Sequence, residues 1–245
     1  EIMSSDWSSD VCSSDLGLRV GNTPEVLTEA VADIAMLCLL GAARRAVEAQ
    51  RMLREGRWTR WHTTQLVGRE LHGRKLGIVG MGRIGQATAR RARGFGLEIH
   101  YHNRKRLPAD REAGAVFHAE LATMLPEVDI VSLSCPATPA TTRMVDAGFL
   151  QAMKPGSILV NTARGALVDE HALTDALDAG HLFAAGLDVF EGEPNVDPRL
   201  MAYDNIFALP HIGSATVETR NAMGFCCLDN LDAFFAGRAL PYGLV

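Results

Sequence analysis

A glycine-rich turn between an apolar strand and a helix is the feature that most restricts how this chain can fold. The apolar segment 75–79 leads directly into the sequence GMGRIG at residues 80–85, and a helical segment follows at 86–95. A second strand, expected at 97–102, completes a strand–helix–strand unit. A G-x-G-x-x-G turn in this context presents backbone N–H groups and a helix N-terminus to a pyrophosphate. The segment therefore predicts a dinucleotide-binding site.

The alternation of strands and helices continues along the chain. Further strands are expected at 130–133, 157–161, 184–189 and 206–209, and further helices at 23–55, 121–125, 146–153, 169–178 and 217–235. Strands that alternate with helices form a parallel sheet with helices on both faces. We therefore expect an α/β protein with a Rossmann fold, a doubly wound parallel sheet, and only a remnant of a second substrate domain.

Three parts are expected along the chain. The first repeats the triplet Ser-Ser-Asp without a helix, strand or signal-peptide pattern, so we interpret residues 1–16 as a non-native segment. Residues 17–215 are expected to form the dinucleotide-binding domain, including an N-terminal helical arm. Residues 216–245 are expected to be the C-terminal helix of a truncated substrate domain.

Composition argues against several classes of protein. A net charge of −5 is not that of a nucleic-acid-binding protein, so we expect no nucleic-acid partner. The sequence lacks a run of about 20 apolar residues, so no membrane span is expected. Five cysteines without a C-x-x-C pair indicate reduced thiols and a cytoplasmic protein. No cluster with metal-ligand spacing is present, so no metal is expected.

The residues after the second expected strand bear on the choice of coenzyme. A carboxylate there binds the ribose 2′-hydroxyl of NAD, whereas an arginine accommodates the 2′-phosphate of NADP. Here Asn103 is followed by Arg104 and Lys105, without an acid. Because a guanidinium group pairs well with phosphate, we predict NADP as the preferred coenzyme and NAD as the alternative. The alternative interpretation is that Arg104 and Lys105 are only exposed charges in a loop.

Polar residues near the later strands have the chemistry needed to reduce a 2-oxo acid. Arg164 follows an expected strand, and its planar fork can bind carboxylate and ketone oxygens together. His211 follows the last strand, and histidine is the natural proton donor near neutral pH. A carboxylate beside it would favour imidazolium, and Glu191 and Glu193 are both candidates. Asp188 is a further acid that we expect to act on the coenzyme amide.

Taken together, the motifs resemble the D-isomer-specific 2-hydroxyacid dehydrogenase family. The resemblance covers the chain from Gly17 onward and rests on GMGRIG, NTARGALVDE, GLDVFEGEP and LPHIGSAT. Within the family, the chain is most similar to glyoxylate/hydroxypyruvate reductases. That similarity rests on the Asn103-Arg104 pair and on the spacing of Arg164, Glu193 and His211.

The resemblance implies a reaction and a role for each site residue. The reaction is hydride transfer from NAD(P)H to a small 2-oxo acid such as glyoxylate or hydroxypyruvate, which gives the D-2-hydroxy acid. Arg164 would anchor the substrate, Glu193 would be the glutamate that supports His211, and His211 would give the proton. Together with Gly80, Gly82 and Gly85, the implied coenzyme contacts are Met81, Arg83, Ile84, Asn103, Arg104, Lys105, Cys135, Pro136, Thr141, Thr162, Ala163, Asp188 and Gly213.

The resemblance also implies an assembly and a missing part. The arm at 23–55 resembles the segment through which these enzymes form homodimers. The family has a substrate domain of about a hundred residues before this point. The Ser-Ser-Asp segment stands in its place, so we expect poor turnover by this chain alone. Two other interpretations stay open: a non-catalytic dinucleotide-binding or sensing scaffold, and a family dehydrogenase acting on phosphoglycerate, phosphite or formate.

Overall fold

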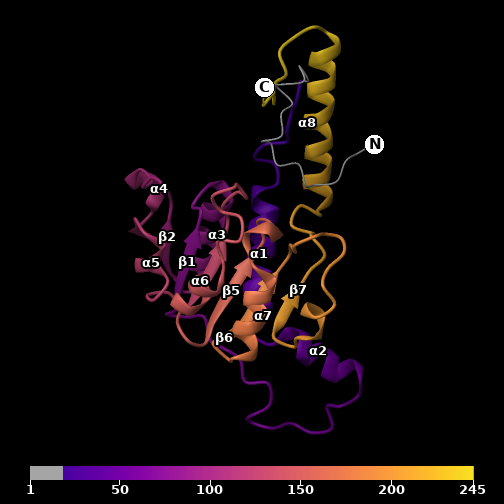
Figure 1. Cartoon of the computed structure of the whole chain (residues 1–245). Helices are drawn as coiled ribbons and strands as arrows, with labels where there is room; N and C mark the ends of the chain where they lie inside the picture. The colour runs from indigo at the N-terminus through magenta and orange to yellow at the C-terminus, as the bar shows by residue number, and fades with distance from the viewer. Residues whose placement is uncertain (1–18, 245) are drawn as a thin grey trace. The chain divides into compact units, whose positions relative to one another are not determined.

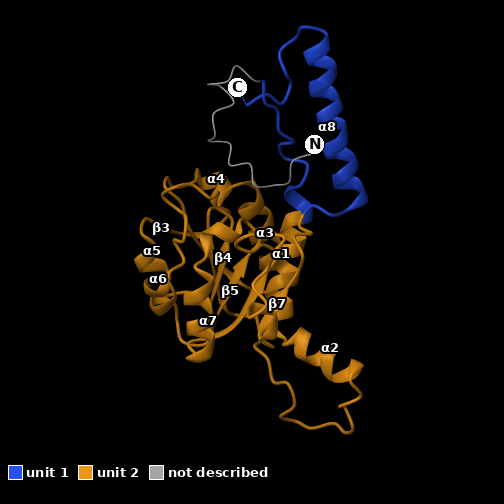
Figure 2. Ribbon diagram, turned by 45° about the vertical axis from the view of Figure 1, so that its right-hand side comes forward, with its two compact units in different colours: residues 1–30, 214–245 blue, residues 31–213 orange. Residues whose placement is uncertain are grey.

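The structure, a computed structural model, describes residues 19–244 and divides into two compact units. The larger unit spans residues 31–213, and the smaller one combines residues up to 30 with those from 214 onward (Figure 2). The non-native segment expected at 1–16 lies outside the described residues. Within residues 19–244, no helix has both the length and the apolar character that a membrane span requires.

A parallel sheet forms the centre of the larger unit (Figure 1). Its strands are β1 (Lys75–Val79), β2 (Glu98–His102), β3 (Val116–His118), β4 (Ile130–Leu133), β5 (Ser157–Asn161), β6 (Leu182–Leu187) and β7 (Ile206–Ala208). They pair in the order β3-β2-β1-β4-β5-β6-β7, and every pairing is parallel. The order reverses between β1 and β4, which is where open α/β sheets bind ligands. The predicted Rossmann fold is therefore confirmed.

Helices cover both faces of this sheet. Those that follow the strands are α3 (Arg83–Gly94), α4 (Ala109–Glu112), α5 (Leu121–Met124), α6 (Ala147–Ala152) and α7 (Glu170–Asp178), with short 3₁₀ turns η1 (Gly165–Leu167) and η2 (Leu200–Ala202). Successive strand residues point to opposite faces, so Ile78 joins one buried apolar cluster and Val79 the other. The cluster of Ile78 includes Ala89 of α3, and that of Val79 includes Leu173 of α7.

The prediction of one continuous helix at 23–55 is wrong, both in where the helix begins and in its continuity. It forms α1 (Thr28–Ala43) and α2 (Ala46–Arg54), with Arg45 between them in the left-handed region at φ 53°. The carbonyl of Ala43 accepts a hydrogen bond from the backbone N–H of Arg69 at 2.8 Å. A distant part of the chain therefore takes a carbonyl at the end of α1, and the helix stops there.

Other expected boundaries differ by a few residues. α3 begins at Arg83, inside the glycine motif, and not at residue 86. β6 runs two residues earlier than the strand expected at 184–189. The edge strand β3 was not expected, because its three residues are only partly buried and carry a weak apolar pattern.

In the smaller unit, α8 (Val217–Phe235) has the expected bounds. The hydroxyl of Thr216 accepts from the backbone N–H of Thr219 at 3.1 Å and caps the helix. Asn230 accepts from the backbone N–H of Tyr242 at 3.0 Å and ties the last residues to the helix. Large apolar side chains are exposed along α8: Val217, Phe225, Leu228, Leu231, Phe234 and Phe235. The helix therefore lacks the clean polar face of an amphipathic helix.

Candidate active site

The glycine turn after β1 has the geometry that pyrophosphate binding requires. Gly80 has φ +95°, and a Cβ there would lie 2.6 Å from the backbone nitrogen of Cys135. A Cβ at Gly85 would lie 2.5 Å from the carbonyl oxygen of Gly80. Gly82, which precedes α3, faces open space. Two glycines thus permit close packing, and the third leaves the helix N-terminus accessible to an anion.

Asn103, at the end of β2, holds this turn in place. Its side-chain Oδ1 accepts a hydrogen bond from the backbone N–H of Met81 at 2.7 Å. The same turn is tied to β2 by the N–H of Gly80, which donates to the carbonyl of His102 at 3.0 Å. Asn103 was expected as a coenzyme contact, and the structure adds a contact to the turn that the sequence pattern did not suggest.

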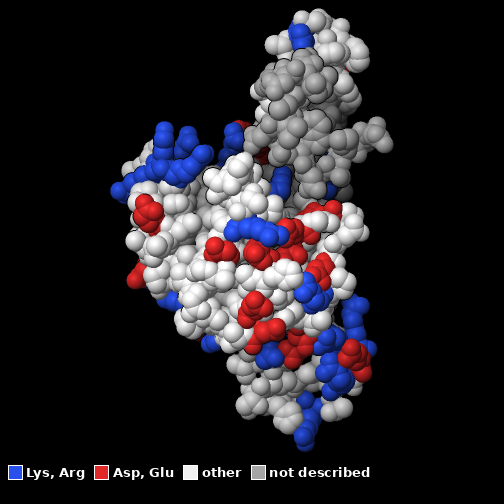
Figure 3. All heavy atoms as spheres, viewed as in Figure 1, with Lys and Arg blue, Asp and Glu red and all other residues white. Residues whose placement is uncertain are grey.

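The bases after Asn103 differ in their surroundings. Arg106 donates two hydrogen bonds to Glu112, at 2.7 and 3.0 Å, and Glu112 also accepts from the hydroxyl of Tyr101 at 2.6 Å. The hydrogen bonds from Arg106 and then Tyr101 lower the pKa of Glu112 to about 2. Arg104 and Lys105 are exposed and stand outside this network. Figure 3 shows basic side chains gathered at the corner of the larger unit where Figure 1 places α4.

The loops after β4 and β5 are ordered by their own polar groups. The hydroxyl of Thr141 donates to the carbonyl of Pro136 and accepts from the N–H of Thr138, each at 2.8 Å. Burial raises the pKa of the Cys135 thiol. The hydroxyl of Thr162 is buried without a hydrogen-bond partner in the described part of the chain. An orphaned buried hydroxyl on the coenzyme-facing edge is a group that a ligand could satisfy.

His211 and Glu193 form the closest polar contact of the site. Glu193 Oε2 lies 2.5 Å from His211 Nδ1, and Glu193 Oε1 accepts from the backbone N–H of Phe190 at 2.7 Å. Both oxygens of Glu193 are therefore engaged, and the imidazole is held by one nitrogen. The other nitrogen, Nε2, has no hydrogen-bond partner among the described residues.

The second candidate glutamate has different partners. Glu191 accepts from Arg143 Nη2 at 2.8 Å, and its backbone N–H donates to Glu170 Oε1 at 2.7 Å. It is exposed, whereas Glu193 is partly buried. Residue type and spacing left both glutamates open as partners of His211, the family resemblance implied Glu193, and the structure places Glu193 beside His211.

Asp188, at the end of β6, holds the histidine loop. Its Oδ1 accepts from the N–H of Ile212 and its Oδ2 from the N–H of Gly213, each at 2.8 Å. Burial raises the pKa of this carboxyl, against the two backbone hydrogen bonds, which act in the opposite direction. His211 itself has φ 52°, in the left-handed region. The carboxylate expected to act on the coenzyme thus fastens the two residues after the proton-donor candidate.

Arg164 lies at the start of η1, and its loop is packed closely. Its Nη1 donates to the carbonyl of Ala163 at 2.6 Å, and the side chain is exposed. The next residue, Gly165, could not carry a side chain, because a Cβ would lie 1.9 Å from the carbonyl oxygen of Phe190. This loop therefore abuts the loop that carries Glu193.

Asn161 holds the loop of Arg164 in position, a role that was not predicted from the sequence. It is buried, its Nδ2 donates to the carbonyl of Arg164 at 2.9 Å, and its Oδ1 accepts from the N–H of Ala163 at 3.1 Å. A lone amide at the end of an apolar strand is the one signal that could have identified it. Within residues 19–244, no group of His, Cys, Asp or Glu side chains is arranged to hold a metal ion.

Known proteins match both the sequence and the fold. The model of the D-isomer specific 2-hydroxyacid dehydrogenase, NAD binding domain, matches residues 36–213. A glyoxylate reductase from Thermococcus litoralis is 47% identical over 230 residues, which are 92% of this chain and 69% of that protein. A glycerate dehydrogenase from Hyphomicrobium methylovorum is 43% identical over 237 residues, 96% of this chain and 73% of that protein.

Solved structures agree with this relation. A putative D-isomer specific 2-hydroxyacid dehydrogenase from Polaromonas sp. JS6 66 superposes with a TM-score of 0.91 at 48% identity, over 95% of this chain and 73% of that one. The NADPH-dependent glyoxylate/hydroxypyruvate reductase of Sinorhizobium meliloti, solved with NADP and malonate, superposes with a TM-score of 0.88 at 42% identity, over 95% and 72%. With its sheet order, glycine turn and matched residues, the chain belongs to the D-isomer specific 2-hydroxyacid dehydrogenase family.

Proposed function

We propose that this protein reduces a small 2-oxo acid, with glyoxylate and hydroxypyruvate as its substrates, to the D-2-hydroxy acid. The contact that carries the proposal is the 2.5 Å pair between Glu193 and His211 at the carboxyl edge of a dinucleotide-binding sheet. Relatives named glyoxylate reductase, at 47% identity, support this choice of substrate.

The residues of the coenzyme edge fit a nicotinamide dinucleotide. Gly82 leaves room beside the N-terminus of α3 for a pyrophosphate, and Thr162 offers an unused hydroxyl. The remaining proposed contacts lie in the turn after β1, in the first turn of α3, or in loops that follow strands β2, β4, β5, β6 and β7. When bound, the coenzyme supplies the hydride.

The proposed chemistry then uses three side chains of this protein. Arg164, whose guanidinium is exposed, binds the substrate carboxylate through its planar fork. His211 donates a proton from Nε2 to the carbonyl oxygen of the substrate. Glu193 keeps Nδ1 in place and stabilises the positive charge that His211 carries before it gives up the proton. Asp188 acts through His211 by holding the backbone of the two residues that follow it.

We further propose that NADP is preferred over NAD. Arg104 and Lys105 stand exposed outside the network that engages Arg106, so both can meet a 2′-phosphate. No carboxylate occupies the position after β2, where NAD-binding proteins carry one. The relative from Sinorhizobium meliloti that is named NADPH-dependent supports the same preference.

A homodimer through the arm at 23–55 is the proposed assembly. α2 has no buried residue in this chain, and Leu53 within the helix and Trp58 after its end are exposed. A short helix without a packed face gains its stability from a partner. Sedimentation velocity would give the mass of a dimer, and Leu53→Asp would shift it to that of a monomer. A monomer for the unaltered chain would contradict the proposal.

We further propose that the chain divides into a coenzyme domain at 17–215 and a helix of a substrate domain at 216–245. The separation of a small unit from residue 214 onward supports it. The described cysteines, Cys38, Cys135, Cys226 and Cys227, are free thiols, which supports a reducing compartment such as the cytoplasm.

The decisive experiment compares His211→Asn with the matched surface change His171→Gln. We expect glyoxylate-dependent oxidation of NADPH to fall by about 10²-fold or more in His211→Asn, because the proton donor is lost. Coenzyme binding, measured by calorimetry, should stay unchanged in both variants. Equal rates for His211→Asn and the unaltered protein would overturn the assignment. Coenzyme binding without turnover of any 2-oxo acid by the unaltered chain would favour a sensing scaffold.

A further inference from the structure

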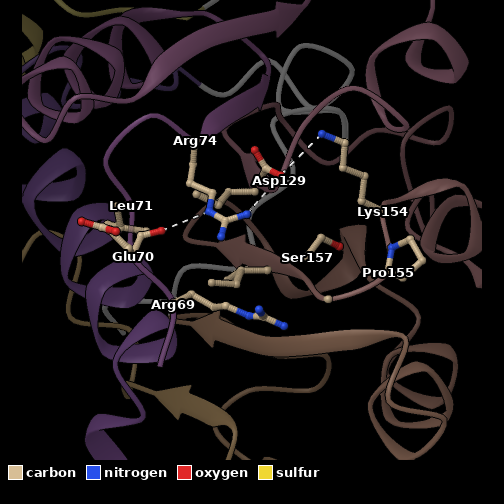
Figure 4. A pocket seen from close by; sticks show the side chains of 11 residues that line it. Arg69, Glu70, Leu71, Arg74, Asp129, Lys154, Pro155 and Ser157 are labelled. Carbon is tan, nitrogen blue, oxygen red and sulfur yellow. Dashed lines mark hydrogen bonds and ion pairs between the residues drawn. The ribbon is translucent and has the colours of Figure 1, made fainter. Parts of the chain in front are cut away.

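A pocket opens at the amino edge of the sheet, on the side opposite to the glycine turn. It has a volume of about 80 Å³ and lies where β1, β4 and β5 begin (Figure 4). In a parallel sheet all amino ends lie at one edge, and the proposed catalytic and coenzyme-binding residues are at the other. The pocket is therefore separate from the active site and has no role in the reaction derived above.

Positive charge exceeds negative charge inside this pocket. Arg69, Arg74 and Lys154 line it, and Asp129 is the carboxylate in contact with two of them. Asp129 Oδ1 lies 3.6 Å from Arg74 Nη1 and 3.4 Å from Lys154 Nζ. These separations are long beside the roughly 2.7–2.9 Å of a strong charged hydrogen bond. The carboxylate of Glu70 is turned away from Arg74, and only its backbone carbonyl accepts from Arg74 Nε, at 3.2 Å (Figure 4).

Arg69 is held in a way that leaves its donors available. Its guanidinium carbon lies 4.8 Å from the ring centroid of Phe183. Among the described residues, no acceptor forms a hydrogen bond or ion pair with its side chain. A guanidinium that stacks on a ring keeps its in-plane N–H groups free to donate. Gly156, at φ +78°, gives it room, since a Cβ there would lie 3.1 Å from Arg69 Nη2.

A buried hydroxyl completes the set of donors. Ser157 is 2% exposed and lines the pocket, and its Oγ has no hydrogen-bond partner in the described chain. Leaving such a group unsatisfied costs about 1–3 kcal/mol, so a partner at this position is favourable. Lys154 Nζ also donates to the backbone carbonyl of Glu127 at 2.8 Å, which leaves the charge of the ammonium uncompensated. The pocket thus offers one free guanidinium, two cations at long separations from Asp129 and an unused hydroxyl. All of these are donors suited to oxygen atoms that carry negative charge.

We propose that this pocket binds one small oxyanion, a phosphate ion or the phosphate group of a small ester. Its volume of about 80 Å³ is several times the roughly 10–15 Å³ that a cavity needs to hold one water molecule, so a single phosphate-sized group has room. Arg69 and Arg74 offer planar forks that match two phosphate oxygens, Lys154 acts as a point charge, and Ser157 donates its hydroxyl. The site does not depend on the proposed reaction, because it shares no residue with it.

The test is titration of the chain with sodium phosphate, followed by calorimetry and ³¹P NMR, against sodium chloride at equal ionic strength. NADP at saturating concentration is present throughout, because the glycine turn also attracts phosphate. We expect saturable binding of one phosphate per chain that NADP does not displace. Absence of phosphate binding while NADP is present, or an equal response to chloride, would overturn the proposal.

Substitutions of the residues that line the pocket test whether phosphate binds there. Arg69→Gln and Lys154→Gln should each weaken phosphate binding by roughly tenfold or more, since each removes a charged donor. Ser157→Ala should weaken phosphate binding less, and it should not lower the thermal midpoint of the chain without phosphate, because the hydroxyl that it removes has no partner there. Arg54→Gln, an exposed arginine on α2, is the matched control and should have no effect. Unchanged affinity in both Arg69→Gln and Lys154→Gln would refute the site.

The two sources of the phosphate group are separated by a second titration with glycerol 3-phosphate. Binding at least as tight as that of free phosphate, with the same sensitivity to Arg69→Gln, would identify the group as part of an ester. Binding of free phosphate alone would identify the ion. Either result supports the site, and binding of neither would contradict it.

Discussion

The loops after β6 and β7 differ from the loop after β2, although all lie at the same edge of the sheet. Asp188 and Glu193 each use both carboxylate oxygens on partners within the protein, and His211 is held as a result. Arg104 and Lys105, by contrast, are exposed and lie outside the Arg106–Glu112 network. The proposed proton donor is therefore held before a substrate binds, whereas the side chains proposed to select the coenzyme are exposed and held by none of these contacts.

Within this comparison, the largest effect is expected when the charged partner of His211 is removed at Glu193. Glu193→Gln removes the charge beside His211, and we expect kcat for glyoxylate reduction to fall by about 10-fold to 100-fold. Glu191→Gln is the matched control, since Glu191 binds Arg143 and not His211, and its kcat should stay within about twofold. Steady-state rates decide the matter, and equal losses in both variants would show that contact with His211 is unimportant.

A smaller effect is expected at Asp188. Asn in its place has one oxygen and one NH₂ group, so it can satisfy only one of the two backbone N–H groups of Ile212 and Gly213. We expect a loss of about 1–3 kcal/mol in the free energy of unfolding, together with a lower kcat. Urea titration measures the first and steady-state kinetics the second, with Asp175→Asn on the surface of α7 as the control. Full stability with unchanged kcat would show that Asp188 does not hold the loop.

In the exposed loop after β2, Arg104→Ala should affect only the binding of the coenzyme. Removing one phosphate partner should weaken NADPH binding by roughly tenfold and leave NADH binding unchanged. Arg111→Ala on α4 is a control of the same charge. Calorimetric titration with both coenzymes gives the comparison, and an equal loss for NADPH and NADH would contradict a role in binding the 2′-phosphate.

The smallest effect is expected at Glu112, which binds Arg106 in the loop after β2. Glu112 has a pKa lowered to about 2 by Arg106 and Tyr101, so its ionised form is stabilised in the folded state. A lowered carboxyl pKa adds stability above the unfolded pKa of about 4.3, and this is lost as the pH falls towards 2. Glu112→Gln should therefore lower Tm at pH 7 by a small amount, and the difference should shrink below about pH 4.3. A difference that stays constant with pH would rule out this ion pair as its cause.

Much of the fold follows from short-range pattern. Apolar runs and the sequence GMGRIG predict β1, its turn and α3 within a few residues, because strand burial and glycine conformation are local properties. Exceptions occur where the local signal is weak or a distant residue intervenes. β3 has three partly buried residues and escaped notice, and the arm breaks at Arg45 because the N–H of Arg69 takes the carbonyl of Ala43.

The candidate site divides in the same way. His211, Arg164 and the glycine turn could be identified from residue type and position after a strand, since parallel strands bring their carboxyl ends to one edge. The partner of His211 could not be derived from that pattern, because Glu191 and Glu193 differ by two positions in an irregular loop. Asn161 was overlooked because its two hydrogen bonds to the Arg164 loop depend on how the chain turns after β5.

The sequence by itself determined the sheet, the nucleotide-binding turn and the set of polar residues at the carboxyl edge, because alternation and glycine placement act over a few residues. Only the tertiary structure decided that Asp188 fastens the residues after His211 and that Arg69, Lys154 and Ser157 meet in one pocket, and it placed Glu193, which the family resemblance had implied, beside His211. Each of these depends on contacts between segments far apart in the chain. The folded backbone, and no local preference, brings those segments together.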